Sequence, residues 1–402
     1  MRFKEDYDGT TVNEIEFNHE GLKIKKVAKG HQKLSSFLKE VFLPEGYPNS
    51  VSRDYLTYQF WDTLQELCST LNGTLASHAI FQGMGVGNSK ASALGATYTW
   101  LMKDGTGMIS NILFAWSKGT LLDIDAKRWR LFADVLNDIA MFLDLLSPLA
   151  PPYLFTFAMC CTSVFRSLVG VAGGCTRATI KQHQAQCNNM ADVSAKDGSQ
   201  EKLSGLLGLV LSMTLINIIS VSPLITWTTF SLLTVLHLYF NYRACSCLVM
   251  KSLNPTRYKV LLEHWFREGS VLNPEQVNCK EPFILGHRGI QKRLVIGASL
   301  EDLDVSRSRM MSELETNESR YIIYSFNDEI RVCLRSGSNH RDQIEAYHLA
   351  YMAALQSSDS TIFLPNTDQK SKYQKFLSEM SQEGWDLSFS PLGASQLRYS
   401  PV

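Results

Sequence analysis

A long stretch without ionised side chains constrains this chain more than any other feature of its sequence. No Asp, Glu, Lys or Arg occurs within Leu203–Tyr242. Two apolar runs fill this stretch, Leu203–Val221 and Pro223–Phe240. Each is long enough for a helix to cross a hydrocarbon core, which takes about 17–25 residues. Because proline disfavours helix in the residue before it, the runs should separate at Ser222. The sequence therefore predicts a helical hairpin that lies in a membrane.

The charges that flank this hairpin are basic, namely Lys196 and Lys202 before it and Arg243, Lys251, Arg257 and Lys259 after it. By the positive-inside rule, both flanks should face the cytosol, or the matrix or stroma of an organelle. The alternative is a hairpin buried in a large soluble bundle. The N-terminus, MRFKEDYD, has neither the apolar core of a signal peptide nor the character of a transit peptide. Membrane insertion is therefore expected from internal segments.

A second apolar region covers Leu145–Phe165, and three prolines interrupt its first half. It is interpreted either as a kinked span or as a re-entrant segment followed by a helix over Tyr153–Val171. Arg166 lies inside Tyr153–Val171.

Small residues recur every four positions at Ala79, Gly83, Gly87, Ala91 and Gly95. On one helix they would form a strip against which a neighbouring backbone packs closely. Shorter strips occur at Gly170, Gly174 and Ala178, and at Ser204, Gly208 and Ser212. Since interior glycine disfavours helix, a break near Gly83–Asn88 is the alternative. Gly83–Asn88 also resembles a phosphate-binding loop, but no strand precedes it, so a role in helix packing or a helix break is favoured.

Residues 126–146 give the clearest amphipathic helix. Its apolar face consists of Leu131, Phe132, Val135, Leu136, Ile139, Phe142, Leu143 and Leu146. Asp134, Asn137 and Asp138 share one face of this helix. If that face turns inward, Arg166 and Arg177 on neighbouring segments are candidate partners, and such buried charges in a membrane bundle mark a functional site. We hypothesise that Asp138 pairs with Arg166. The alternative is an exposed face, paired locally through Arg130 and Asp134.

The polar segment before the hairpin offers a second candidate site. Its candidate residues for a polar ligand or a protein partner at the membrane surface are Asn188, Asn189, Asp192, Lys196 and Asp197. The alternative is a solvated connector. His237, in the second hairpin helix near Asn241, is interpreted as a satisfied, neutral histidine rather than as part of a proton relay.

No motif for catalysis, metal binding or cofactor binding occurs. The nine cysteines form no CxxC pair and are interpreted as reduced, buried thiols. His183 and Cys187 are one helical turn apart, but no further metal ligand lies close in sequence. We therefore expect no enzyme activity and no cofactor. Basic and acidic residues number 39 each, so nothing favours nucleic acid, and the expected partners are membrane lipid and protein.

The composition becomes that of a soluble domain after Asn254-Pro255. Strands are predicted at 283–285, 294–296, 385–390 and 396–399, a linker at 301–318, a hairpin from 321–326 to 330–334, and helices at 342–356 and 371–383. The pattern predicts a small α+β domain over 261–402 with helices on one face of an antiparallel sheet. In the N-terminal segment 1–40, a further hairpin is predicted from 13–17 to 22–27, which could join that sheet.

Three ordered blocks carry a family resemblance. They are FLPEGYPNSVSRDYLTYQFWDTLQ (Phe42–Gln65), a long block that begins GMGVGNSKASALGATYTWLMKDGTG (Gly83–Asp138), and VAGGCTRATIKQHQAQCNNMADVSAKDGSQE (Val171–Glu201). Together they resemble the root UVB sensitive (RUS) family, long described as a domain of unknown function, and the likeness is looser beyond about residue 260. The resemblance implies a eukaryotic, membrane-associated protein. It also implies a link to UV-B responses in roots, seedling development and vitamin B6 balance, as in plant relatives, some of which act in pairs. The family offers no agreed catalytic residues.

We therefore expect a mainly α, multi-helix, membrane-embedded bundle over 41–260 and a small C-terminal α+β domain over 261–402. The expected role is that of an integral membrane scaffold or regulator that acts through protein partners, such as a homologous or identical chain. One alternative is a transporter or carrier of a small metabolite, with Asp134, Asp138, Arg166 and Arg177 lining a cavity. A second alternative is a membrane-associated cofactor-binding protein.

Overall fold

The computed structural model describes residues 2–7, 10–18, 21–26, 34–86, 92–219, 222–282, 293–303, 320–326, 329–355, 361–363, 366–388, 392–395 and 397–400. The chain divides into two compact units. The first unit comprises Met1–Thr97, Met141–Met159 and Ala178–Ala244, and the second comprises Tyr98–Ala140, Cys160–Arg177 and Cys245–Val402. Each unit is described by itself.

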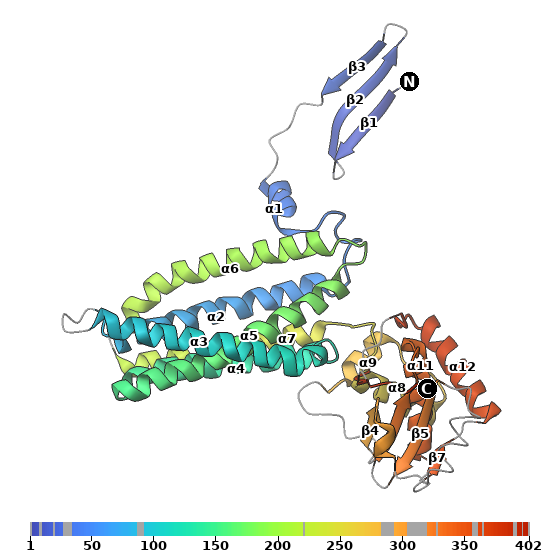
Figure 1. Ribbon diagram of the computed structural model, residues 1–402. Coiled ribbons are helices and arrows are strands. Elements are labelled where there is room, and N and C mark those ends of the chain that lie inside the picture. Colours follow the sequence, from blue (N-terminus) through green and yellow to red (C-terminus); the bar gives the residue numbers. More distant parts are fainter. Residues whose placement is uncertain are drawn as a thin grey trace. The chain divides into compact units, whose positions relative to one another are not determined.

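The first unit begins with a three-stranded antiparallel sheet of β1 (Arg2–Tyr7), β2 (Thr10–Asn18) and β3 (Gly21–Lys26), in the order β1-β2-β3 (Figure 1). The β2–β3 pair confirms the predicted N-terminal hairpin, with Ile15 opposite Ile24. Strand β1 was not predicted, because RFKEDY is rich in charge and poor in the β-branched residues typical of strands. The predicted possibility that this hairpin joins the C-terminal sheet is wrong, since the described strands form two separate sheets.

Long helices dominate the middle of the chain (Figure 1). They are α1 (Leu34–Phe42), α2 (Tyr55–Gly83), α3 (Ala93–Lys118), α4 (Ala126–Leu146), α5 (Pro152–Gln184), α6 (Met190–Ile219) and α7 (Pro223–Cys247). The predicted hairpin is confirmed as α6 and α7. The break falls where proline predicted it, because Pro223 can begin a helix but disfavours helix before it. Helix α5 likewise begins at a proline and follows a short 3-10 turn, Ser147–Leu149, so the predicted kinked span over 145–165 is replaced by two helices.

Small residues bring α2 and α6 together inside the first unit, where the two helices lie side by side (Figure 1). Ser204 Oγ donates to the Thr63 carbonyl at 2.9 Å, and Ser212 Oγ lies 2.9 Å from Thr74 Oγ1. A Cβ atom at Gly208 would lie 2.7 Å from the Cγ2 atom of Thr70. The predicted strip of Ser204, Gly208 and Ser212 is therefore confirmed as a packing surface.

The other two small-residue strips have different outcomes. Helix α2 ends at Gly83, so the alternative of a break there is confirmed, while Gly87 and Ala91 lie outside the described residues. Ala79 is buried in the core of the first unit, and a Cβ at Gly83 would lie 2.2 Å from the Phe155 ring. Gly95 belongs to α3, and a Cβ there would meet only Ser92 of its own segment.

The strip at Gly170 and Gly174 was predicted wrongly. Nothing lies within 4 Å of a Cβ built at either glycine. Helix α5 instead buries Ala172, Thr176 and Ile180, which are four residues apart on another face.

The C-terminal domain lies in the second unit (Figure 1). Its elements are α8 (Pro255–Glu268), α9 (Pro274–Lys280), β4 (Arg293–Ile296), β5 (Tyr321–Phe326), β6 (Glu329–Leu334), α11 (His340–Leu355), β7 (Thr361–Phe363) and α12 (Thr367–Gln382). The predicted hairpin and both predicted helices are confirmed. The sheet has the order β4-β6-β5-β7 and is mixed, because β4 runs parallel to β6 while the other pairs are antiparallel. The expectation of a fully antiparallel sheet is therefore wrong.

Helix α11 packs on this sheet over one apolar core. Tyr258 and Leu261 of α8 belong to the same core. The strand predicted at 283–285 lies outside the described residues. In the segments 385–390 and 396–399, where strands are predicted, the described residues form the isolated bridges of Asp386 with Ser252 and of Tyr399 with Arg335.

Candidate functional site

Helix α4 turns its charged side inward and its apolar side outward. The buried side chains include Lys127, Arg130, Asp134, Asp138 and Asp144, and the exposed ones include Phe132, Val135, Ile139, Phe142 and Leu146. A surface helix of a water-soluble protein has the opposite arrangement. Exposed large apolar side chains also occur on α3, α5, α6 and α7, among them Ile112, Phe157, Leu207 and Val235. Such an extended apolar surface is typical of an interaction with lipid or protein.

Two helices within the described residues are long and apolar enough to cross a membrane, Tyr153–Gln184 of α5 and Pro223–Cys247 of α7. In their most apolar stretches only 22% and 11% of the residues are buried. The core helix of a soluble protein would be mostly buried. Helix α6, the first helix of the predicted hairpin, is not one of these two.

The candidate polar residues of α4 lie in the second unit. Arg130 Nε lies 3.7 Å from Asp134 Oδ2, so the local pair expected for an exposed face forms on a buried one. Asn137 and Arg177 are half-buried and Arg166 is exposed. The pairing of Asp138 with Arg166 stays a prediction.

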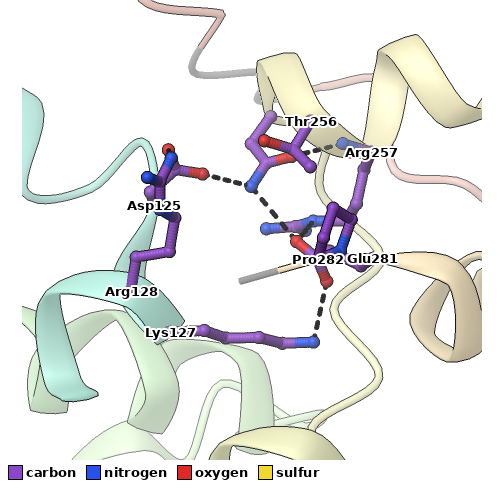
Figure 2. A pocket seen from close by; sticks show the side chains of 8 residues that line it. Asp125, Lys127, Arg128, Thr256, Arg257, Glu281 and Pro282 are labelled. Carbon is purple, nitrogen blue, oxygen red and sulfur yellow. Dashed lines mark hydrogen bonds and ion pairs between the residues drawn. The ribbon is translucent and has the colours of Figure 1, made fainter. Parts of the chain in front are cut away.

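A buried ionic network in the second unit joins the first turn of α4 to the start of α8 and to the residue after α9 (Figure 2). Lys127 Nζ lies 2.8 Å from Glu281 Oε2, and Arg257 Nε lies 3.0 Å from Glu281 Oε1. Asn254 supplies a third link. Its Nδ2 atom donates to Asp125 Oδ1 at 2.6 Å and to Glu281 Oε1 at 3.3 Å.

Local sequence positions two of these groups. Asn254 caps α8, because its Oδ1 accepts the Arg257 backbone N–H at 2.7 Å and Pro255 occupies the first helical position. Lys127 also donates to Asn278 Oδ1 at 2.5 Å, and Asn278 Nδ2 donates to the Ser246 carbonyl at 2.9 Å. The network thus reaches from α4 through α9 to the end of α7.

The two cations decide the charge of the central carboxyl group. Burial alone would favour neutral Glu281, but Arg257 and Lys127 outweigh it, and the pKa of Glu281 lies below its usual value. Burial raises the pKa of Asp125, although Arg128 and Arg257 oppose the rise. These side chains fill the space between them, because the volume left for a water-sized molecule is about 0 Å³. The network can hold segments together, but it leaves no room for a substrate.

Sequence reasoning missed this network. Asn254-Pro255 was noted only as a boundary, and Lys127 and Glu281 are too far apart in the chain for any local pattern to pair them. The one usable signal is the helix cap at Asn254.

The first unit has its own buried polar pairs along α2. At its start, His183 Nε2 lies 2.9 Å from Asp54 Oδ2. Asp197 lies 2.7 Å from Lys181 Nζ and accepts from Gln59 Nε2 at 3.1 Å. Further along the helix, Gln65 Nε2 lies 2.9 Å from His237 Nε2, and Asn72 Nδ2 donates to Thr234 Oγ1 at 3.0 Å. His237 is buried and hydrogen-bonded, which confirms its interpretation as a satisfied histidine.

The candidate loop 188–197 is mostly helix, because α6 begins at Met190. Both the ligand or partner role of this segment and the alternative of a solvated connector stay predictions. Asn188 precedes the helix with a left-handed φ of 54°, and Asn189 Oδ1 accepts the Cys187 backbone N–H at 3.2 Å. Asp192 Oδ2 accepts the Glu45 N–H at 2.7 Å, and Lys196 donates to the Glu40 carbonyl at 2.5 Å. These side chains fasten α1 and its following loop to α6.

An open groove of about 600 Å³ lies between α3 and α5 in the second unit. Its lining consists of Asp104, Gly107, Met108, Asn111, Ile112, Ser163 and Ser167. Ser167 Oγ donates to the Gly107 carbonyl at 2.7 Å, and a Cβ at Gly107 would lie 2.5 Å from Ser163 Oγ. Small and polar residues thus line part of the groove, beside the exposed apolar side chains of Met108 and Ile112. Among the described residues, no group of three or more His, Cys, Asp or Glu side chains is placed to hold a metal.

These features define a class of protein: a helical protein with inward charges, an apolar exterior and a mixed-sheet domain at its C-terminal end. Residues 28–269 match the family described as the vitamin B6 photo-protection and homoeostasis domain, and residues 270–372 match the root UVB sensitive protein C-terminal family. The chain belongs to the root UVB sensitive family.

Named relatives agree with this assignment. The chain is 38% identical over 361 residues to protein root UVB sensitive 3 of Arabidopsis thaliana, which covers 86% of this chain and 82% of that protein. It is 46% identical over 264 residues to RUS family member 1 of Dictyostelium discoideum, covering 65% of this chain and half of the relative. Protein root UVB sensitive 2, chloroplastic, of Arabidopsis thaliana is 26% identical over 360 residues, covering 88% of this chain and 82% of that protein. No solved structure matches the chain.

Proposed function

We propose that the chain is an integral membrane protein that serves vitamin B6 homoeostasis as a scaffold or regulator acting through protein partners. The observation that carries the membrane part is α4, whose charged side is buried while Phe132, Ile139 and Phe142 are exposed. Lipid favours this distribution and water opposes it. The low burial of the two apolar helices supports the same conclusion.

The α3–α5 groove supports a partner-binding role. Gly107, Ser163 and Ser167 hold α3 and α5 together, and the groove beside them exposes Met108 and Ile112, apolar side chains that a partner would cover. The buried ionic network around Glu281 is filled by its own side chains, which suits a structural role rather than catalysis. The proposal therefore assigns the chain no catalytic step.

Two experiments test this function. Alkaline carbonate should leave the full chain in the membrane pellet, and its release would contradict membrane insertion. A photo-crosslinker in place of Ile112, an exposed residue in the groove, should give a discrete protein adduct in intact membranes. The matched control is Leu232 of α7, which is also exposed but lies outside the groove, and it should give no such adduct.

A transporter of a small metabolite is the second candidate. Two polar residues in the lining of the open groove, Asp104 and Asn111, favour it, although Asp134, Asp138, Arg166 and Arg177 are not part of that lining. Proteoliposomes that take up a B6 vitamer faster than empty liposomes would support transport. Absence of uptake together with the adduct at Ile112 would support the scaffold.

A further inference from the structure

Arg243, the first charged residue after the uncharged stretch, rests on aromatic rings. Its guanidinium carbon lies 4.6 Å from the centre of the Trp61 ring and 5.9 Å from that of Tyr239. Its Nη1 atom donates to the Tyr239 hydroxyl at 3.0 Å. Within the described residues, Arg243 forms no ion pair with a carboxylate. The side chain is exposed, so its remaining N–H donors are available.

Lys202 lies at the same level of the first unit as Trp61. The Ser204–Thr63 hydrogen bond joins α6 to α2, and these helices run in the same direction, since Gly208 faces Thr70 further along. Trp61 and Lys202 each precede this bond by two residues, which is about 3 Å along a helix axis. Lys202 is exposed. We call Trp61, Lys202, Tyr239 and Arg243 the aromatic–basic level.

The charged parts of α2 and α6 end near this level, because the last Asp, Glu, Lys or Arg is Glu66 in α2 and Lys202 in α6. On one side lie the ion pairs Asp54–His183 and Lys181–Asp197. On the other side come the Gln65–His237 pair and then an apolar core that includes Leu75 and Phe230. Trp and Tyr concentrate where a membrane meets water, and cations there face lipid phosphates.

We infer that the aromatic–basic level binds the head groups of anionic phospholipids, with Arg243 and Lys202 as the cations that contact phosphate. The inference rests on the proposed membrane insertion. A guanidinium can donate two parallel hydrogen bonds to one phosphate, and stacking on Trp61 holds its plane in place. Lys202 adds positive charge at the same level, which favours lipids with net negative charge over zwitterionic ones.

The test uses the full chain in a neutral detergent and follows its thermal unfolding midpoint while lipid is added. The probes are phosphatidylglycerol, phosphatidylcholine and inorganic phosphate. The variants are Arg243→Gln and Lys202→Gln, and the matched control is Arg267→Gln, which removes an exposed arginine from α8. Phosphatidylglycerol should raise the midpoint of the wild type and the control. Each of the two variants should bind it about fivefold more weakly, since one cation at a membrane surface contributes about that factor.

Equal apparent affinity of Arg243→Gln and wild type for phosphatidylglycerol would overturn the inference. So would an equal response of the wild type to phosphatidylcholine, or the same shift with inorganic phosphate alone, which would indicate a site for free anions. Carbonate extraction of the same proteins separates the two proposals. Release of the wild type contradicts membrane insertion and the inference with it. Retention without lipid preference contradicts only the inference.

Discussion

Lys127 Nζ lies 2.8 Å from Glu281 Oε2, and each of the two side chains is only 4% exposed. Arg257 approaches the other oxygen of the same carboxylate. One carboxylate therefore forms ion pairs with two buried cations, and its removal takes this ion pair from both.

Glu281→Gln should destabilise the second unit by about 3–5 kcal/mol, because breaking a buried ion pair leaves uncompensated charge away from water. The free energy of unfolding in denaturant measures this. Asp368→Asn is the control, since Asp368 and Lys372 form an exposed pair whose loss should cost at most about 1 kcal/mol. Similar effects of the two variants would contradict a buried, coupled network.

Acid should destabilise the C-terminal domain through His348. This side chain is fully buried and is enclosed by aromatic rings that include Phe376 at 4.9 Å and Tyr373 at 5.3 Å between ring centres. Burial lowers the pKa of His348 to about 3. The unfolded chain binds a proton below about pH 6.5 and the folded chain does not. The contribution of neutral His348 to the free energy of unfolding is therefore fully present above about pH 6.5. Below that pH the free energy of unfolding falls by at most about 1.4 kcal/mol per pH unit, down to about pH 3.

His348→Leu should remove this part of the acid sensitivity. Unfolding free energies at several pH values from 7 to about 4 measure it, with His340→Gln, a change at an exposed histidine, as the control. An unchanged pH slope in His348→Leu would show that other groups cause the acid loss.

Two glycines of α6 should respond oppositely to alanine. A Cβ at Gly208 would lie 2.7 Å from Thr70 Cγ2, whereas nothing lies within 4 Å of a Cβ at Gly205. Gly208→Ala should cost about 1–3 kcal/mol through overpacking against α2. Gly205→Ala should be neutral or stabilise by up to about 1 kcal/mol, because alanine favours helix. Thermal midpoints in detergent compare the pair, and equal shifts would argue against close packing at Gly208.

A charge on the exposed face of α7 should hinder insertion. Val235 is exposed and lies in the middle of that helix. Val235→Arg should cost about 2.5–3.5 kcal/mol of insertion free energy if the helix lies in lipid. The fraction of newly made protein that resists carbonate extraction measures this. Leu355→Arg, at an exposed apolar residue that ends α11, should leave that fraction unchanged. Equal fractions for both variants would place α7 in water.

Local sequence signals predicted much of the fold. Pro223 marks the break between α6 and α7, and the antiparallel strands β5 and β6 form at two successive runs of strand-forming residues. Both signals act within a few residues of the feature that they determine. The parallel pairing of β4 with β6 depends on residues far apart in sequence, and no local pattern encodes it.

The candidate sites were harder to predict for the same reason. The amphipathic pattern of 126–146 was recognised, but whether its charged side faces the interior depends on what surrounds the helix, and only the structure shows Asp134 and Asp138 buried. Asp192, Lys196 and Asp197 were recognised as a polar group. They hold other segments against α6 through contacts with Glu45, Glu40 and Lys181, which are far from them in sequence.

The two family regions of the chain meet between residues 269 and 270. Lys127 and Arg257 lie before this junction, and Glu281 lies after it. Each region therefore holds a charge whose ion-pair partner lies in the other region. A chimera that takes its C-terminal region from a relative keeps the ion pair of Lys127 only if that relative has an acidic residue at the position of Glu281. A substitution on either side of this junction therefore affects the stability of both regions.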